Sequence, residues 1–306
     1  MKGRSIYQII IIGRNAYLNL HGNDPLRLAG ATAFFSFFSL PSLLIIARQV
    51  FRVLIPEPVA VSHDRLIGQL ALLLGYQSAS KLENISDNLQ KVPLSPWLTV
   101  MGIVFVLVVS TTMLVVIKGS LNQLWNVTLK PTTKHSLISL LKDRLTALCI
   151  ILFSILLISI YINVDAFLRT SSSMTGMELN LARGAHVVLV GLFLTLWVGT
   201  LFRFLPDAKL SLQALIIGAM ATSVLLMLGG WGLEQILVKS HLGNIYGTSG
   251  SLIIVLLFVF YASFIFYFGA TFSRTYALYR NLRFEPSRQA VSYQINEVEE
   301  KTPPPV

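Results

Sequence analysis

Acidic side chains are the first place to look for chemistry, and two of them lie beside long apolar stretches. Asp165 and Glu234 each follow directly after such a stretch. Inside a membrane an ionisable group is expensive to bury and is usually functional, but at the membrane surface hydration or an ion pair is sufficient. We therefore expect both acids to be hydrated or paired with a base such as Arg48 or Arg52, and His186 to be an interfacial polar residue.

The groups needed for metal or nucleotide chemistry do not occur together in the sequence. Its five histidines are scattered, no two of them have the spacing of metal ligands, and there is no Walker loop. The single cysteine, Cys149, falls within an apolar stretch, where a lone thiol is usually a small core residue. We therefore predict no catalytic residue, no metal and no cofactor.

A proline inside the first apolar stretch is the next candidate feature. Pro41 cannot donate a helical hydrogen bond, so the carbonyl of Phe37, four residues earlier, loses its partner. Thr32, Ser36 and Ser39 lie nearby and would provide a polar lining if the helix breaks there to form a cavity. The alternative is an ordinary kink in which these hydroxyls bond to their own helix.

Asn122 and Arg203 are further candidates, and each has two interpretations. Asn122 lies in the sequence LNQLW, where it either caps a helix end beside the interfacial Trp125 or locks two helices across the bundle. Arg203 precedes a tight turn at Pro206, where it either extends to lipid headgroups or binds an anionic group.

A glycine-rich segment introduces the last apolar stretch. Residues 243–250 read GNIYGTSG, with Tyr246 and Gly247 at the centre, and the sequence GGWG starts nearby at Gly229. These glycines permit a tight loop or the close approach of a substrate or a neighbouring helix. Close helix packing is the simpler interpretation, and a substrate-lining role is the alternative.

Membrane-spanning helices are the elements that must position these residues. The 306-residue chain is 54% hydrophobic and only 12% charged, against roughly a quarter charged in an average soluble domain. Its charge-free stretches are about as long as the ~20 residues that a helix needs to cross a bilayer, and a backbone in hydrocarbon must satisfy its own hydrogen bonds. We predict an all-α bundle of about six spans, near residues 28–47, 97–117, 145–164, 184–202, 210–233 and 248–272.

The basic residues indicate how these spans are oriented. Of the 24 lysines and arginines, sixteen lie before the first span, after the last, or in the connections between spans two and three and spans four and five; eight lie on the other side. The positive-inside rule then places both termini in the cytoplasm. The net charge of +10 is accordingly a signal of topology that also suits anionic lipid headgroups, and not a sign of nucleic-acid binding.

Residues 1–283 are predicted to form a single transmembrane domain. Ahead of the first span, an apolar run flanked by Arg4 and Arg14 predicts an amphipathic helix on the membrane surface. Residues 64–90 have a helical apolar period that predicts one or two short amphipathic helices outside the membrane, between spans one and two. Residues 165–183 are expected to be a plain loop, and the polar, proline-containing residues 284–306 a disordered cytoplasmic tail.

Several motifs, spread in order over residues 25–280, resemble those of the YihY/BrkB family. The matching segments are residues 31–41, the sequence LNQLW at 121–125, residues 203–206 followed by Gly218-Ala219, residues 246–252, and the closing Gly269-Ala270. The family commonly has an acid after the closing Gly-Ala, whereas this chain has Thr271. The resemblance implies a bacterial inner-membrane protein of about six spans, in a family whose members have been labelled a virulence factor, a ribonuclease, and a transporter or lipid-related permease.

Two functions are consistent with the sequence. The first is a transporter or permease for lipids or other amphiphiles, with membrane lipids as partners and an anionic or amphipathic substrate; the lack of acids within the spans favours facilitated movement or flipping over ion-driven pumping. The alternative is a non-catalytic membrane scaffold. Ribonuclease activity would require an acid, base or metal cluster in water-accessible segments, and the sequence contains none.

Overall fold

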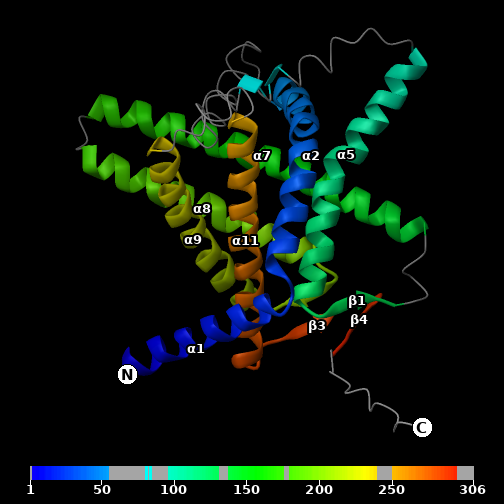
Figure 1. Ribbon diagram of the computed structural model, residues 1–306. Helices are drawn as coiled ribbons and strands as arrows, with labels where there is room; N and C mark the ends of the chain where they lie inside the picture. Colours follow the sequence, from blue (N-terminus) through cyan, green and yellow to red (C-terminus); the bar gives the residue numbers. More distant parts are fainter. Residues whose placement is uncertain are drawn as a thin grey trace.

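The computed structural model describes residues 2–54, 80–81, 83–84, 96–130, 137–175, 179–239 and 250–294 as a bundle of long helices (Figure 1). The helices are α1 (Lys2–His21), α2 (Pro25–Leu54), α5 (Pro96–Leu124), α7 (Leu137–Thr175), α8 (Leu179–Phe204), α9 (Leu212–Lys239) and α11 (Gly250–Tyr279). All of these except α1 are long and apolar enough to cross a membrane. The predicted all-α architecture with six spans is therefore confirmed.

The helices extend past the ends of the apolar stretches that predicted them, and α7 does so most. The expectation of a plain loop over residues 165–183 is wrong, because α7 continues to Thr175 and α8 begins at Leu179. No proline or glycine occurs in residues 165–175, so nothing in the local sequence stops the helix where the apolar stretch ends. The predicted helices over residues 64–90 lie outside the described residues, apart from 80–81 and 83–84, which are helical.

The helix α1 crosses the lower end of α11 in Figure 1 and does not run parallel to it. Ile12, Ala16 and Leu20 recur every four residues, so they share one face, and they are buried in the core of the bundle. Tyr7 and Leu18 are exposed. One buried face and one exposed apolar face suit the predicted amphipathic helix on a membrane surface.

Four short strands lie at the same end of the bundle as α1, which we call the base. They are β1 (Val127–Leu129), β2 (Ala208–Leu210), β3 (Phe284–Pro286) and β4 (Ala290–Ser292). The strand β1 pairs antiparallel with β4, and β2 pairs antiparallel with β3. The expectation that residues 284–294 belong to a disordered tail is therefore wrong: the chain after α11 is held by hydrogen bonds to the segments that follow α5 and α8.

The helices α9 and α11 pack through very small residues. A Cβ atom built on Gly218 would lie 1.6 Å from the Ser273 hydroxyl, and one on Gly269 would lie 1.7 Å from the Thr222 hydroxyl. Gly229 is covered in the same way by the Tyr261 side chain. Small residues that let two helices approach closely are the usual basis of packing in membranes, and this agrees with the simpler interpretation of Gly229.

Candidate functional site

The buried polar residues of the bundle are almost all serine and threonine. In the part of the chain that the structure describes, fifteen polar or charged residues are buried, and fourteen of them are serine or threonine; the other is Asp165. Many of these hydroxyls donate to a carbonyl four residues earlier, as Ser110 does to Val106 at 2.7 Å. Such bonds satisfy a hydroxyl within its own helix, so the informative hydroxyls are those that bond elsewhere or have no partner.

Three helices meet at a set of hydroxyls that we call the hydroxyl seam: Thr32, Ser36 and Ser39 of α2, Ser120 of α5, and Tyr267 of α11. The Tyr267 hydroxyl is bonded to Thr32 and to Ser120. Thr32 also donates to the carbonyl of Leu28 at 3.0 Å. Tyr267 is fully buried, so a single phenol connects all three helices inside the bundle.

The two other hydroxyls on α2 behave differently from each other. The Ser39 hydroxyl donates to the carbonyl of Val109 in α5 at 2.7 Å, which is a bond between helices. The Ser36 hydroxyl is buried and has no hydrogen-bond partner among the described residues. The helix α2 continues through Pro41, so the proline removes one helical bond without ending the helix.

The last turns of α11 contain Thr271, Ser273 and Arg274. The Thr271 hydroxyl is buried and bonds to carbonyls of its own helix, at 2.8 Å to Phe268. The Ser273 hydroxyl, which faces Gly218, has no hydrogen-bond partner among the described residues. Arg274 donates to the carbonyl of Leu124 at 3.1 Å and so satisfies an acceptor at the end of α5.

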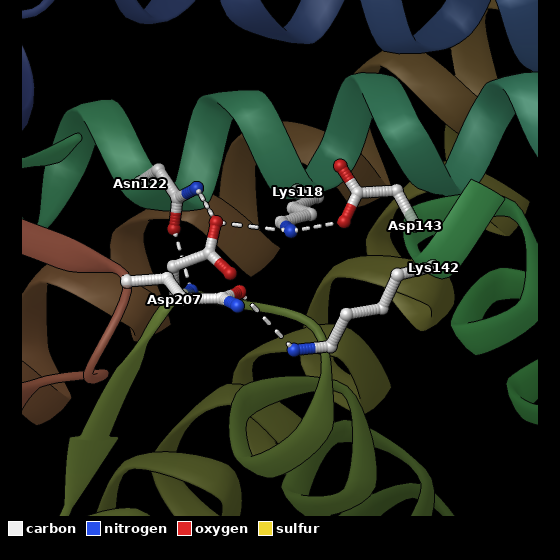
Figure 2. A network of polar contacts seen from close by, with 6 residues as sticks. Lys118, Asn122, Lys142, Asp143 and Asp207 are labelled. Atoms are coloured by element: carbon white, nitrogen blue, oxygen red, sulfur yellow. Dashed lines mark hydrogen bonds and ion pairs between the residues drawn. The ribbon is translucent and has the colours of Figure 1, made fainter. Parts of the chain in front are cut away.

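Near the base, a network of charged and amide side chains joins three parts of the bundle (Figure 2). The Lys118 ammonium of α5 lies 2.6 Å from Asp143 of α7 and 2.9 Å from Asp207, in the turn between α8 and β2. Asn122, one turn after Lys118, donates to the Asp207 carboxylate at 2.9 Å and accepts from the Asp207 backbone N–H at 2.8 Å. We call these four residues the basal clamp.

The basal clamp is partly withdrawn from water and carries more negative than positive charge. The side chains of Lys118, Asp143 and Asp207 are 13%, 20% and 17% exposed. One ammonium between two carboxylates stabilises both, and removal of a buried partner is far more damaging than the net worth of the pair. The arrangement therefore fixes α5, α7 and the α8–α9 connection relative to one another.

A hydrogen bond between a carboxylate and a histidine lies between α7 and α8. The Asp165 carboxylate is 7% exposed and lies 2.9 Å from Nδ1 of His186, which is 42% exposed. The sequence suggested Arg48 or Arg52 as the partner of this acid; those two side chains lie outside the described parts. Among the described residues, no group of three histidines, cysteines or acids could hold a metal ion.

A comparison with protein families gives a match to the model described as "Virulence factor BrkB" over residues 16–294. The chain belongs to the BrkB family. No curated protein and no solved structure matches the chain significantly. The resemblance seen in the sequence is confirmed. The prediction that the chain is a multi-pass membrane protein is confirmed as well.

Three of the segments that carry the resemblance to the BrkB family contact one another, or residues next to one another, in the fold. Asn122 binds Asp207, which directly follows the segment 203–206. The Trp125 indole is fully buried and donates to the carbonyl of Ala270 at 3.0 Å. Gly218 lies against Ser273. Motifs far apart in the sequence of this BrkB-family protein thus form one continuous packing unit near the base.

Of the remaining predicted residues of this BrkB-family protein, Arg203 is the one with a described side chain. Arg203 is exposed, and its Nη1 donates to the carbonyl of Leu210 at 3.3 Å, so its described contact is with β2. Glu234 lies in α9, but its side chain is outside the described parts, as are Tyr246 and Gly247 altogether. The structure therefore brings together Thr32 with Tyr267, and Asn122 with Asp207.

Sequence reasoning did not find Lys118, Asp143, Asp207 or Tyr267. Their signals are weak: Lys118 and Asn122 have helical i, i+4 spacing, and both aspartates lie within a few residues of an apolar stretch. Tyr267 is one of ten tyrosines and sits in an aromatic run, so nothing marks its hydroxyl as a link between helices.

Proposed function

We propose that this protein is an inner-membrane permease that moves lipids or other amphiphiles without coupling to an ion gradient. The hydroxyl seam is the observation that carries the proposal. It places hydrogen-bonding groups inside the bundle without a carboxylate among them, and one of these, Ser36, has no partner among the described residues. Weak polar groups of this kind suit the passage of a polar headgroup, which must be solvated but not trapped.

The distribution of acids supports movement without ion coupling. Proton-driven transporters use intramembrane acids as relays. Asp143 and Asp207 are instead held by the Lys118 ammonium. Asp165, near one end of the candidate span Ile138–Leu168, is hydrogen-bonded to His186 and is not part of the hydroxyl seam. Thr271 occupies the position where the family commonly has an acid, and its hydroxyl is bonded within α11. The proposal thus includes neither catalysis nor a cofactor.

We further propose that the base faces the cytoplasm. The sixteen basic residues assigned to the cytoplasmic side by sequence include those at the base, and the positive-inside rule then orients the whole chain. Exposed apolar residues of α1 would enter the inner leaflet beside Arg14, which suits anionic headgroups.

Purified protein in liposomes tests the proposal. Wild-type protein should carry a fluorescent phospholipid between leaflets, and Thr32→Val combined with Tyr267→Phe should slow this movement because the seam loses its link between helices. Thr200→Val is the matched control, since the Thr200 hydroxyl donates only to Leu196 of its own helix, at 2.8 Å. Wild-type vesicles that move no lipid would contradict the proposal.

A scaffold is the second candidate, and one observation favours it. The two strand pairs and the basal clamp hold the connections at the base in a fixed arrangement, as a docking surface requires. A scaffold predicts that the wild type and the seam variants alike move lipid no faster than protein-free vesicles do. It also predicts that substitutions in exposed residues of β3 and β4 abolish association with a partner.

A further inference from the structure

Arg144 directly follows Asp143 of the basal clamp on α7, but its side chain contacts the middle of α5. Its Nη1 donates to the hydroxyls of Thr111 and Thr112 and to the carbonyl of Val108, each at 2.9 Å. Thr111 and Thr112 precede Lys118 by seven and six residues, which is about 9–10 Å along the helix axis. The sequence analysis placed Arg144 in a connection between two spans, but its side chain is bonded to the middle of the span formed by α5.

The three acceptors on α5 all engage the same terminal nitrogen of Arg144. The opposite edge of the guanidinium carries Nε and Nη2, whose N–H groups point the same way and form a fork. No described residue accepts a hydrogen bond from this edge, and no described carboxylate lies within ion-pair distance of it. The neighbouring acid, Asp143, pairs with Lys118. The fork is thus held in place and has no partner in the part of the chain that the structure describes.

Apart from Lys142, the large exposed side chains near Arg144 in sequence on α7 are apolar, and so are those on the preceding turns of α5. Exposed side chains of α7 on either side of it are Leu140, Leu141 and Leu145, and those of α5 are Met101, Val104, Phe105 and Val108. In a bilayer this surface contacts acyl chains. A guanidinium there is costly unless an anion or water reaches it, so the surroundings favour an anion that brings its own hydrocarbon.

We propose that Arg144 binds the phosphate of a phospholipid where α7 lies against α5, with Thr111 and Thr112 as positioning residues. A guanidinium fork matches two phosphate oxygens and forms charge-assisted hydrogen bonds with both. The threonine hydroxyls and the Val108 carbonyl fix the plane of the fork, and the exposed leucines and Phe105 contact the acyl chains. The site deepens the proposed function because it names the chemical group that is recognised. A role of the site in transport rests on the proposed function, whereas lipid binding at the site does not.

Binding of defined lipids to detergent-purified protein, measured by native mass spectrometry, tests the site. The probes are phosphatidylglycerol, diacylglycerol with the same chains, and inorganic phosphate. We expect phosphatidylglycerol to bind most tightly, since only it supplies both phosphate and chains. Arg144→Gln should weaken its binding about tenfold or more, as expected for lost hydrogen bonds to a charged group, and Thr111→Val with Thr112→Val should weaken it less.

Two further variants keep the result interpretable. Arg144→Lys retains the charge but not the fork, so it should fold and still bind phosphatidylglycerol more weakly than the wild type. Arg283→Gln removes an exposed arginine that is already paired with Glu285 and should leave binding unchanged. Unchanged binding in both Arg144 variants, or binding of diacylglycerol as tight as that of phosphatidylglycerol, would overturn the site. Inorganic phosphate bound as tightly as the lipid would overturn the choice of ligand.

Lipid movement assayed with the same proteins separates this site from the proposed function. Wild-type protein that binds phosphatidylglycerol through Arg144 but moves no lipid contradicts the permease and leaves the site standing. If wild-type protein moves lipid but the Arg144 variants bind phosphatidylglycerol as tightly as the wild type, the site is contradicted and the permease is not.

Discussion

The base of the bundle and its interior are held together by different chemistry. At the base, ionised side chains and strand pairs connect distant parts of the chain: Lys118 lies between two carboxylates, and the residues after α11 pair with β1 and β2. In the interior, the contacts are hydroxyls and glycines, as where Gly269 lies against Thr222. Ionised side chains lie where water lowers the free-energy cost of burying a charge, and close packing of small residues predominates where lipid surrounds the helices.

The largest expected effect comes from filling the α9–α11 contact. Gly269→Val would place a side chain where the Thr222 hydroxyl lies, 1.7 Å from the new Cβ, and the helices would have to separate. Overpacking of this kind costs about 3 kcal/mol of unfolding free energy or more. Gly230→Val is the matched control, because a Cβ at Gly230 meets nothing within 4 Å. Thermal unfolding in detergent measures both, and equal melting temperatures would show that the contact is not close.

Removing the ammonium from the basal clamp should have the next largest effect. Lys118→Met leaves Asp143 and Asp207 facing each other, partly buried and without a cation. Removal of a partner from a fully buried pair costs about 3–5 kcal/mol, and partial exposure reduces the expected loss to about 1–2 kcal/mol. Lys142→Met is the control, since Lys142 makes only a 3.5 Å bond to Gln289. If both variants unfold at the same temperature, the clamp does not hold the base together.

The hydroxyl seam should contribute less to stability than the clamp. Tyr267→Phe removes the phenol that bonds Thr32 and Ser120, at a cost of about 1 kcal/mol, as is typical of hydrogen bonds between membrane helices. Tyr279→Phe, at a side chain that is 43% exposed, should have no measurable effect. Chemical unfolding of the two variants compares them. A loss for Tyr267→Phe larger than that for Lys118→Met would reverse the ranking of interior and base.

The smallest effect is a pH dependence in β3. The Arg283 guanidinium, 2.7 Å from Glu285, lowers the pKa of that carboxyl. A lowered pKa stabilises the folded protein at neutral pH, and this contribution disappears as the pH falls through the folded-state pKa in the acidic range. Both side chains are exposed, so Glu285→Gln should change the melting temperature only slightly at pH 7 and not at all in acid. A larger difference in melting temperature between Glu285→Gln and the wild type in acid than at pH 7 would contradict the predicted direction of the pH dependence.

The sequence was sufficient to predict what depends on local composition. Long charge-free stretches required helices, and six of them were found in the structure. The pairs at the base depend on how helices pack: Asn122 and Asp207 are 85 residues apart, and no local pattern indicates that they meet. The strands β3 and β4 were missed because three residues in a terminal segment form a strand only when a partner supplies the hydrogen bonds.

The candidate site was predicted only in part for the same reason. Thr32, Ser36 and Ser39 were recognised because they precede a proline in an apolar stretch, but Tyr267, the partner of Thr32, was not. Asn122 was given two interpretations, and its bonds to Asp207 join α5 to another part of the bundle, as in the second of them. Arg144 appeared to be a loop residue because α7 begins eight residues before the apolar stretch that predicted it.

Phospholipid movement in vesicles without any ion gradient tests the central claim most directly. Purified protein is reconstituted with a fluorescent phospholipid in both leaflets, and a membrane-impermeant reductant destroys the label that reaches the outer leaflet. We predict nearly complete loss of fluorescence, at a rate that an imposed proton or sodium gradient does not change. Loss of the outer-leaflet label alone, as in protein-free vesicles, would contradict a permease, and movement that requires a gradient would contradict uncoupled transport.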